Sequence, residues 1–407
     1  MKKSTSFMAL AGVAALVLAG CADDAADETT DSTEDTVETT DSEDTEDTDT
    51  DTDTEDTDTE DTDTEDTDGE GTEDGDGAGR DYASIDASEY TACIVSDAGG
   101  WDDKSFNESA FNGLMEAEEL MGVQTSTAES SSDTDFAPNV NAMVAEGCDL
   151  VIGVGFLLEE ATSGAAQENP NVSFALVDSP FETPSDNARA LLFNTAEAAY
   201  LAGYAAAGMT ETGVVATFGG LPIPSVQIFM DGFVDGVAAY NEAYPDANVQ
   251  VLGWDKESQT GSFSNSFDDQ AQGQQLANNF INQGADIIMP VAGPVGLGAA
   301  AAAQTAGDVY IIGVDSDWYE SAPEFSSIIL TSVLKDIDVS VLDAIADVAT
   351  DEFDSEAYVG TLENGGVNIA PFHDFESDVP AELVSEIDAL REQIISGELV
   401  VETPNAP

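Results

Sequence analysis

The chain has 407 residues, of which 84 are Asp or Glu and only 8 are Lys or Arg, so its formal net charge at neutral pH is −76. A surface this acidic repels nucleic acid and anionic lipid, which argues against both as partners bound through charge. One of the three cysteines stands in the N-terminal segment described next, so two cysteines and one histidine remain, which are too few for a zinc site of the His/Cys type, and we expect no metal and no cofactor.

The first 21 residues have the pattern of a secretory signal. Lys2 and Lys3 precede an apolar run, 7–19, that is short for a membrane span. Leu18-Ala19-Gly20-Cys21 resembles a bacterial lipobox, in which the cysteine is acylated and becomes the new N-terminus; an ordinary signal peptide with a chance cysteine is the alternative. We therefore expect lipidation of Cys21 and an anchor on the extracytoplasmic face of the cell membrane.

Residues 22–87 are predicted to form a disordered acidic tether. Residues 22–79 hold 29 of the 84 acids, no Lys or Arg and almost nothing apolar, so they cannot bury enough surface to fold. The D-T-D-T-E repeats lack the flanking helices of an EF-hand, and only weak, nonspecific cation binding is expected. From Arg80 onward 55 acids face 6 cations, which predicts a salt-tolerant bacterial source where salt screens the repulsion.

From about Tyr90 apolar runs alternate with helical patterns, which predicts an α/β fold with parallel sheets covered by helices on both faces. Ser105-Phe106-Asn107-Glu108 fits the S-x-x-E capping box and puts Phe106 and Asn107 in the first turn of a helix. Cys93 and Cys148 lie in or beside buried strands, and we expect two reduced core cysteines rather than a disulfide. The first lobe, 88–194, should contain strands at 90–95, 123–127, 150–154, 173–177 and 190–193 and helices at 105–121, 135–145 and 157–167.

The stretch from Asp97 to Gly113 reads D-A-G-G-W-D-D-K-S-F-N-E-S-A-F-N-G. It resembles the signature of the basic membrane lipoprotein family, the substrate-binding lipoproteins of ABC importers that include purine-nucleoside receptors. Further matches extend to about Gly366 and so cover nearly the whole folded region. The resemblance implies a two-lobe, periplasmic-binding-protein-like fold of type I, with an ABC permease and ATPase as partners.

A second series of elements should form the second lobe, 195–317. Residues 318–350 are expected to return to the first lobe, and 351–407 to complete the second. The predicted strands of these regions are 213–218, 248–252, 286–290, 310–314, 328–334 and 358–361, and the helices are 195–207, 223–240, 270–283, 296–305, 336–350 and 381–396.

Candidate binding groups in the first lobe fall at strand ends and at a helix start, which form the ligand crevice of an open α/β sheet. Asp97 ends the first strand and is either a turn or cap carboxylate or a ligand contact. Asn107, in the first turn of the helix, is likewise either a structural residue or a ligand contact. Phe106 either packs in the core or offers its face to a planar ring, and the resemblance favours the ring. Asp178 ends another strand and suits hydrogen bonds from a base edge. Lys104 is expected to pair with a neighbouring Asp and fix the loop.

In the second lobe the resemblance supplies the remaining candidates. Phe229, in a glycine-glycine, Ile-Pro, then Phe-x-x-Gly-Phe pattern, would stack on the other face of a base; Phe233 should be core. The family places the backbone of a glycine, here Gly293, close to the ligand. Asp315 lies in G-V-D-S-D and would accept hydrogen bonds from ribose hydroxyls. Lys335 ends a family run and would offset that carboxylate and donate to a ribose oxygen.

Enzyme functions are not expected. His373 stands in Pro-Phe-His-Asp near no cysteine and no G-x-S-x-G elbow. The glycines of 293–298 have the wrong spacing for either phosphate-binding loop. The absence of a helix-turn-helix before the sheet disfavours a repressor.

These features predict a monomeric receptor that closes on a nucleoside, more specifically a purine nucleoside. The alternatives are a receptor of the same fold for riboflavin or a sugar, and a sensor lipoprotein without an importer.

Overall fold

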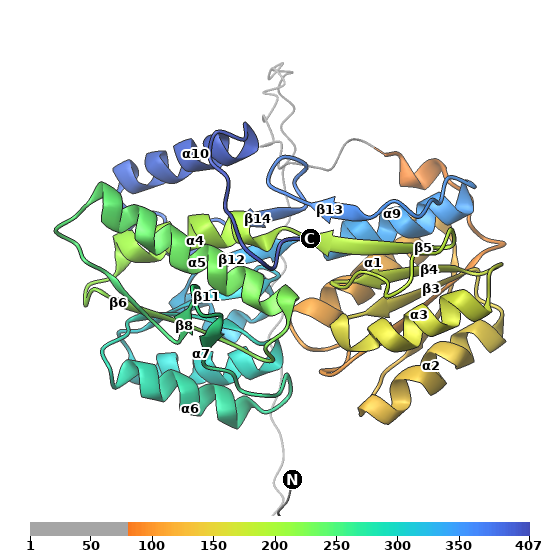
Figure 1. Cartoon of the computed structure of the whole chain (residues 1–407), viewed down its shortest axis with the longest axis horizontal. Coiled ribbons are helices and arrows are strands. Elements are labelled where there is room, and N and C mark those ends of the chain that lie inside the picture. The colour runs from red at the N-terminus through yellow and green to blue at the C-terminus, as the bar shows by residue number, and fades with distance from the viewer. Residues whose placement is uncertain (1–79) are drawn as a thin grey trace, which may run out of the picture. The chain divides into compact units, whose positions relative to one another are not determined.

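The computed structural model describes residues 80–407, so the predicted signal, Cys21 and the tether up to residue 79 lie outside the described residues. The last part of the predicted tether, 80–87, is instead packed on the fold, where Arg80 pairs with Asp347 over 2.6 Å and Ala87 is completely buried. Within 80–407 the chain forms two lobes, each with a six-stranded sheet flanked by helices (Figure 1). The predicted α/β fold class is confirmed. None of the helices in this part of the chain is long and apolar enough to span a membrane.

The sheet of lobe 1 has the strand order β13-β5-β4-β3-β1-β2, and every neighbouring pair is parallel. Its central strand β3 is buried along its whole length and β1 along all but its first residue, as expected where helices cover both faces. The strands are β1 (Thr91–Ser96), β2 (Gln124–Ala128), β3 (Leu150–Val154), β4 (Ser173–Val177), β5 (Ala188–Phe193) and β13 (Tyr358–Gly360), and the helices are α1 (Phe106–Met121), α2 (Asp133–Glu146), α3 (Glu159–Glu168) and α9 (Ile337–Ala349).

The sheet of lobe 2 has the order β14-β12-β11-β10-β6-β7 and is parallel except for β14, which runs antiparallel to β12. Its strands are β6 (Val214–Gly219), β7 (Gln250–Leu252), β10 (Ile287–Val291), β11 (Tyr310–Asp315), β12 (Ile329–Lys335) and β14 (Val367–Ile369). A small hairpin, β8 (Trp254–Asp255) and β9 (Thr260–Gly261), follows β7. The helices are α4 (Thr195–Met209), α5 (Pro224–Ala243), α6 (Gln270–Ile281), α7 (Pro294–Ala306), α8 (Trp318–Ser321) and α10 (Ala381–Ile395).

The chain crosses between the two sheets after β5, after β12 and between β13 and β14. Residues 318–350 therefore differ from the prediction, because β12 continues the parallel pairing of β11 and only α9, which packs against α1, returns to lobe 1. The C-terminal part differs too, since β13 pairs with β5 of lobe 1 before the chain goes back to lobe 2. Sequence pattern alone could not choose between two sheets with equally apolar strands.

Cys93 and Cys148 form a disulfide with their Cα atoms 6.0 Å apart, so the prediction of two reduced cysteines is wrong. Cys93 lies in β1 and pairs in register with Val151 of β3, while Cys148 stands just before β3. Both cysteines belong to one buried cluster. The parallel pairing of β1 with β3 therefore brings together two residues that are 55 positions apart in sequence.

Candidate ligand-binding site

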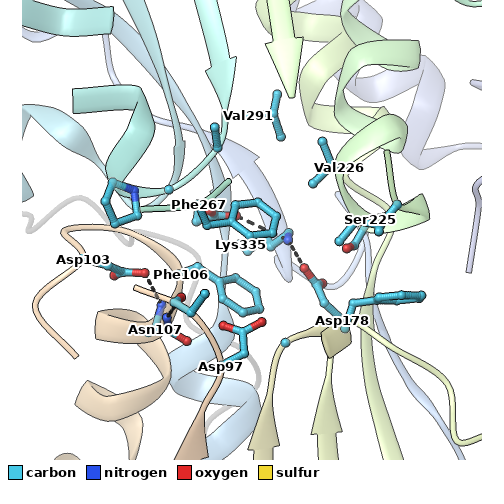
Figure 2. Close-up of a pocket in the computed structure, with 18 of the residues that line it drawn as sticks. Asp97, Asp103, Phe106, Asn107, Asp178, Ser225, Val226, Phe267, Val291 and Lys335 are labelled. Atoms are coloured by element: carbon cyan, nitrogen blue, oxygen red, sulfur yellow. Dashed lines mark hydrogen bonds and ion pairs between the residues drawn. The ribbon is translucent and has the colours of Figure 1, made fainter. Parts of the chain in front are cut away.

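A pocket lies at the carboxyl ends of strands from both lobes (Figure 2). Every predicted ligand residue lines it, and their contact with a ligand stays a prediction. Lobe 1 contributes Asp97, Phe106, Asn107 and Asp178, and lobe 2 contributes Phe229, Gly293, Asp315 and Lys335.

The N-terminus of α1 is capped by Asp103 and not by Ser105, so the predicted capping box is wrong although the helix does begin at Phe106. The Asp103 carboxylate accepts the backbone N–H groups of Ser105 (3.0 Å), Asn107 (2.9 Å) and Glu108 (3.0 Å). Burial raises the pKa of Asp103 to about 6, against the opposing effect of these three bonds. The carboxylate of Asp103, two residues before Ser105, thus caps the helix in place of the Ser105 hydroxyl.

The Ser105 side chain is free to join the two lobes. Its Oγ lies 2.9 Å from the carbonyl oxygen of Val314 and 2.9 Å from Oδ2 of Asp315, both in β11 of lobe 2. Ser105 is completely buried. The start of α1 is therefore fixed against the strand end that carries a predicted ligand residue.

The neighbouring residue, Lys104, makes a second connection between the lobes. The hydroxyls of Ser316 and Ser321 donate to its carbonyl oxygen over 2.9 and 2.8 Å. Its φ of +61° is an uncommon, strained conformation for a non-glycine residue, of the kind found at functional sites. Its ammonium contacts Asp102, which confirms the predicted loop-fixing pair.

Lys335 is the charged centre of the pocket, with a side chain only 3% exposed. Its Nζ contacts the carboxylate of Asp178 from lobe 1 and lies 3.3 Å from Oδ1 of Asp315 in lobe 2. Burial lowers the pKa of Lys335, but the two carboxylates outweigh it and the net shift is upward, so the ammonium stays charged. The same Nζ lies 5.0 Å from the ring centroid of Phe106 and 4.9 Å from that of Phe229.

Both carboxylate partners of Lys335 have left-handed backbone, with φ of +64° at Asp178 and +69° at Asp315. Asp178 follows β4 directly, and Asp315 is the last residue of β11. Aspartate tolerates this conformation better than most residues because its short side chain bonds locally. The turn out of each strand places the two carboxylates around one ammonium, across the boundary between the lobes.

Asp97 and Asn107 form a second polar group in lobe 1. Burial, and next the nearby charge of Asp103, raise the pKa of Asp97 well above its usual range. A Cβ on Gly155, which has a φ of +106°, would lie 1.9 Å from Oδ2 of Asp97, so only glycine leaves room for the carboxyl group. The Asn107 amide donates to the carbonyl of Ala98 over 3.0 Å, while its buried Oδ1 has no partner among residues 80–407. Buried polar atoms are nearly always bonded, so Oδ1 is a place for a ligand donor.

Other lining residues were not identified from sequence. Phe156 follows β3 after one intervening residue, Gly155, and its position near a strand end was an available signal. Ser225 stands inside the quoted family pattern of lobe 2. Phe267 lies between β9 and α6, where no periodic pattern marks it. Phe233 is completely buried, which confirms it as core.

Two α/β lobes connected by three crossings, with a polar and aromatic pocket between their strand ends, define the class of two-lobe solute-binding proteins. The sequence matches the family model of the PnrA-like ABC transporter substrate-binding proteins over residues 91–404, and the chain belongs to this family. The predicted resemblance is thereby confirmed. The members of this family are substrate-binding proteins of ABC transporters rather than enzymes.

Named relatives and a solved structure agree with this assignment. The chain is 31% identical to the ABC transporter nucleoside-binding protein BmpA of Lactococcus lactis, over 77% of this chain and 89% of that protein. It is 30% identical to basic membrane protein A of Borreliella burgdorferi, over 74% and 85%. A crystal structure of an ABC transporter solute-binding protein from Aeropyrum pernix matches with a TM-score of 0.70 and 26% identity, over 77% of this chain and 94% of that one.

Proposed function

We propose that this protein binds a nucleoside, with purine nucleosides preferred, between its lobes and delivers it to an ABC permease and its ATPase. The observation that carries the proposal is the cluster at Lys335. There, one buried ammonium meets carboxylates from both lobes and lies near two phenylalanine rings, one from each lobe. The similarity to a protein named as nucleoside-binding supports the same ligand class.

The base would be held by stacking and by the polar group of lobe 1. Phe106 and Phe229 each offer a ring face, and one stacked face contributes about 1–3 kcal/mol in nucleic-acid sites. Stacking tolerates many bases, so hydrogen bonds must orient the ring. The unpartnered Oδ1 of Asn107 accepts a base N–H, and the buried carboxyl of Asp97 bonds an adjacent edge atom.

The sugar would be held by the charged cluster. Asp315 accepts hydrogen bonds from ribose hydroxyls, Lys335 donates to a ribose oxygen, and Asp178 keeps the ammonium in place. Gly293, at the start of α7 with a φ of +52°, presents backbone to the same cavity.

The ligand groups come from both lobes, so a bound nucleoside favours the closed arrangement of the lobes over an open one. The remaining parts of the proposal concern the export and the anchoring of the chain. Residues 1–21 direct export, Cys21 carries the lipid, and 22–79 tether a monomer to the outer face of the membrane.

The test is a thermal-shift screen of the purified protein against purine and pyrimidine nucleosides, riboflavin and sugars. A ligand at 100 times its dissociation constant adds about 2.7 kcal/mol of stability, which a shift assay detects. Phe106→Ala should weaken nucleoside binding by about 5- to 150-fold, the equivalent of one stacked face. A screen in which only riboflavin or a sugar stabilises the protein would replace the nucleoside with that ligand.

A further inference from the structure

The segment between β9 and α6, residues 262–269, lies beside the pocket in lobe 2 and contributes one lining residue to it. Its backbone is hydrogen-bonded to Gly219, the last residue of β6, and to Gly220. The N–H of Gly219 donates to the carbonyl oxygen of Ser262. The N–H groups of Ser264 and Asn265 donate to the carbonyl oxygens of Gly219 and Gly220, and all three bonds are 2.8–3.0 Å long. The segment therefore extends along the end of β6, next to the helix that carries Phe229.

Side chains fix the same segment from within. The Ser264 hydroxyl is buried and lies 2.7 Å from the carbonyl oxygen of Ser266. The Ser266 hydroxyl accepts the backbone N–H groups of Asp268 and Asp269, over 2.9 and 3.1 Å. Asp269 caps α6 through the N–H groups of its first turn. A loop held at so many points keeps its side chains in fixed directions.

Phe267 is the residue of this loop that lines the pocket, and Figure 2 draws it among the lining side chains. Its ring rests on Gly220, because a Cβ there would lie 2.3 Å from the ring Cε1 atom. Phe267 is half-buried and belongs to none of the aromatic pairs of residues 80–407, whereas Phe263 in the same loop packs edge-on against Trp254. The ring thus has backbone on one side and the pocket on the other.

The loop faces the Asp97 end of the pocket. Directly after the loop, the carbonyl oxygen of Gln270 lies against α7, since a Cβ on Gly298 would be 1.9 Å from it. The start of α7 in turn meets the Asp97 and Asn107 group of lobe 1, since a Cβ on Gly99 would lie 3.6 Å from Cγ of Pro294 and 3.3 Å from Nδ2 of Asn107. The ammonium of Lys335 and the two carboxylates around it form the other polar group of the site, which is proposed to hold the sugar. Phe267 therefore lies on the side where a heterocycle extends away from its sugar.

We propose that Phe267 is a specificity-determining residue, whose ring contacts the outer part of the ligand's heterocycle and favours bicyclic over monocyclic bases. This inference rests on the proposed nucleoside function. Phe106 and Phe229 stack on any base, and a purine extends further from the ribose than a pyrimidine does. The third ring adds an apolar contact that only the larger base reaches.

The experiment compares guanosine and uridine binding by calorimetry in the wild type, Phe267→Ala, Gly220→Ala and the control Phe325→Ala. An aromatic contact corresponds to about 2- to 10-fold in affinity, so Phe267→Ala should weaken guanosine by that factor and uridine by less than about 2-fold. Gly220→Ala displaces the ring without removing it and should reproduce this selective loss. Phe325 is a half-buried phenylalanine of lobe 2 outside the pocket, so its replacement should leave both affinities unchanged.

Unchanged guanosine binding in Phe267→Ala, or equal losses for guanosine and uridine, would overturn the assignment of Phe267 while leaving nucleoside binding intact. A wild-type protein that binds neither nucleoside would overturn the proposed function itself. Thermal unfolding of each ligand-free variant separates a loss of contact from a loss of fold. If Phe267→Ala has lost its fold, Phe267→Leu replaces it, because leucine keeps apolar bulk without the aromatic ring. This variant should likewise bind guanosine more weakly and uridine nearly unchanged.

Discussion

Replacing Lys335 with Met should destabilise the protein strongly and in a pH-dependent way. Methionine keeps the length and the apolar stem of lysine but removes the charge that lies between Asp178 and Asp315. Both carboxylates are less than a tenth exposed, so water cannot replace the ammonium. Removing one partner of a buried ion pair typically costs about 3–5 kcal/mol.

The expected shift in melting temperature follows from the size of the folded region. Unfolding entropy of about 2.1 cal/mol/K per residue gives roughly 0.7 kcal/mol/K for residues 80–407. A loss of about 3–5 kcal/mol then lowers the melting temperature by about 4–7 °C. Nucleoside affinity should fall as well, because in the proposed binding mode the sugar loses its donor and the two lobes lose their shared cation.

The pH dependence has a definite sign. Burial raises the pKa of Asp178, and Lys335 opposes that rise, so in the variant the folded-state pKa moves further above the unfolded value. The folded protein then binds more protons than the unfolded chain, and its stability falls as pH rises through this window. The variant should lose less stability relative to wild type at pH 5 than at pH 8.

Thermal and urea unfolding of both proteins at pH 5, 6.5 and 8 measure this. Lys256→Met is the matched control, because Lys256 pairs with Asp235 at a partly exposed site, where ion pairs contribute about 1 kcal/mol or less. If Lys335→Met lowers the unfolding free energy no more than this control does, or if the loss does not change with pH, then Lys335 is not the buried partner that stabilises the two carboxylates.

Three further predictions concern the whole fold. Asp336 lies at the crossing into α9, and its pKa is raised to about 7 by burial and then by Asp338, so the stability of the wild type should fall by up to about 4 kcal/mol from pH 4 to 7. In urea titrations the Asp336→Asn variant should flatten this dependence of stability on pH. The control Asp308→Asn, at an exposed position, should leave it unchanged. Reducing the disulfide should lower the unfolding free energy by about 4 kcal/mol, since it closes a loop of 55 residues, and equal urea midpoints with and without reductant would contradict this. Raising NaCl from 0.1 to 2 M should raise the melting temperature, and a loss of cooperative unfolding only at high salt would count against a salt-adapted surface.

The positions of the site carboxylates could be predicted because parallel strands end at one edge of a sheet. Asp97, Asp178 and Asp315 each stand at or directly after the end of a buried apolar run, and that placement holds in the structure. The contact of Lys335 with Asp315 was expected from the resemblance, but its pairing with Asp178 of lobe 1 could not be predicted, because it depends on which sheet β12 joins. The sequence pattern placed that strand in the wrong lobe.

Local patterns failed where a competing group was close in sequence or distant in space. Ser105 fits a capping box, but Asp103 offers an ionised acceptor to the same N–H groups, and charge-assisted bonds are stronger than neutral ones. The disulfide depends on the register of β1 against β3, which no spacing of cysteines reveals. Phe267 depends on a loop whose path is set by backbone bonds to Gly219 and Gly220.

The few cations of residues 80–407 explain how an acidic surface and a precise site coexist. Each one is already bonded to an oxygen, and most carboxylates on the surface have no cation to pair with. Salt should therefore stabilise the fold by screening repulsion among exposed acids, while the buried Lys335 cluster is screened much less. Nucleoside affinity should accordingly change little over the salt range in which stability rises. The cations and their partners are Arg80 with Asp347, Lys104 with Asp102, Arg189 with Asp347 and Asp354, Lys256 with Asp235, Lys335 with Asp178 and Asp315, and Arg391 with Asn368.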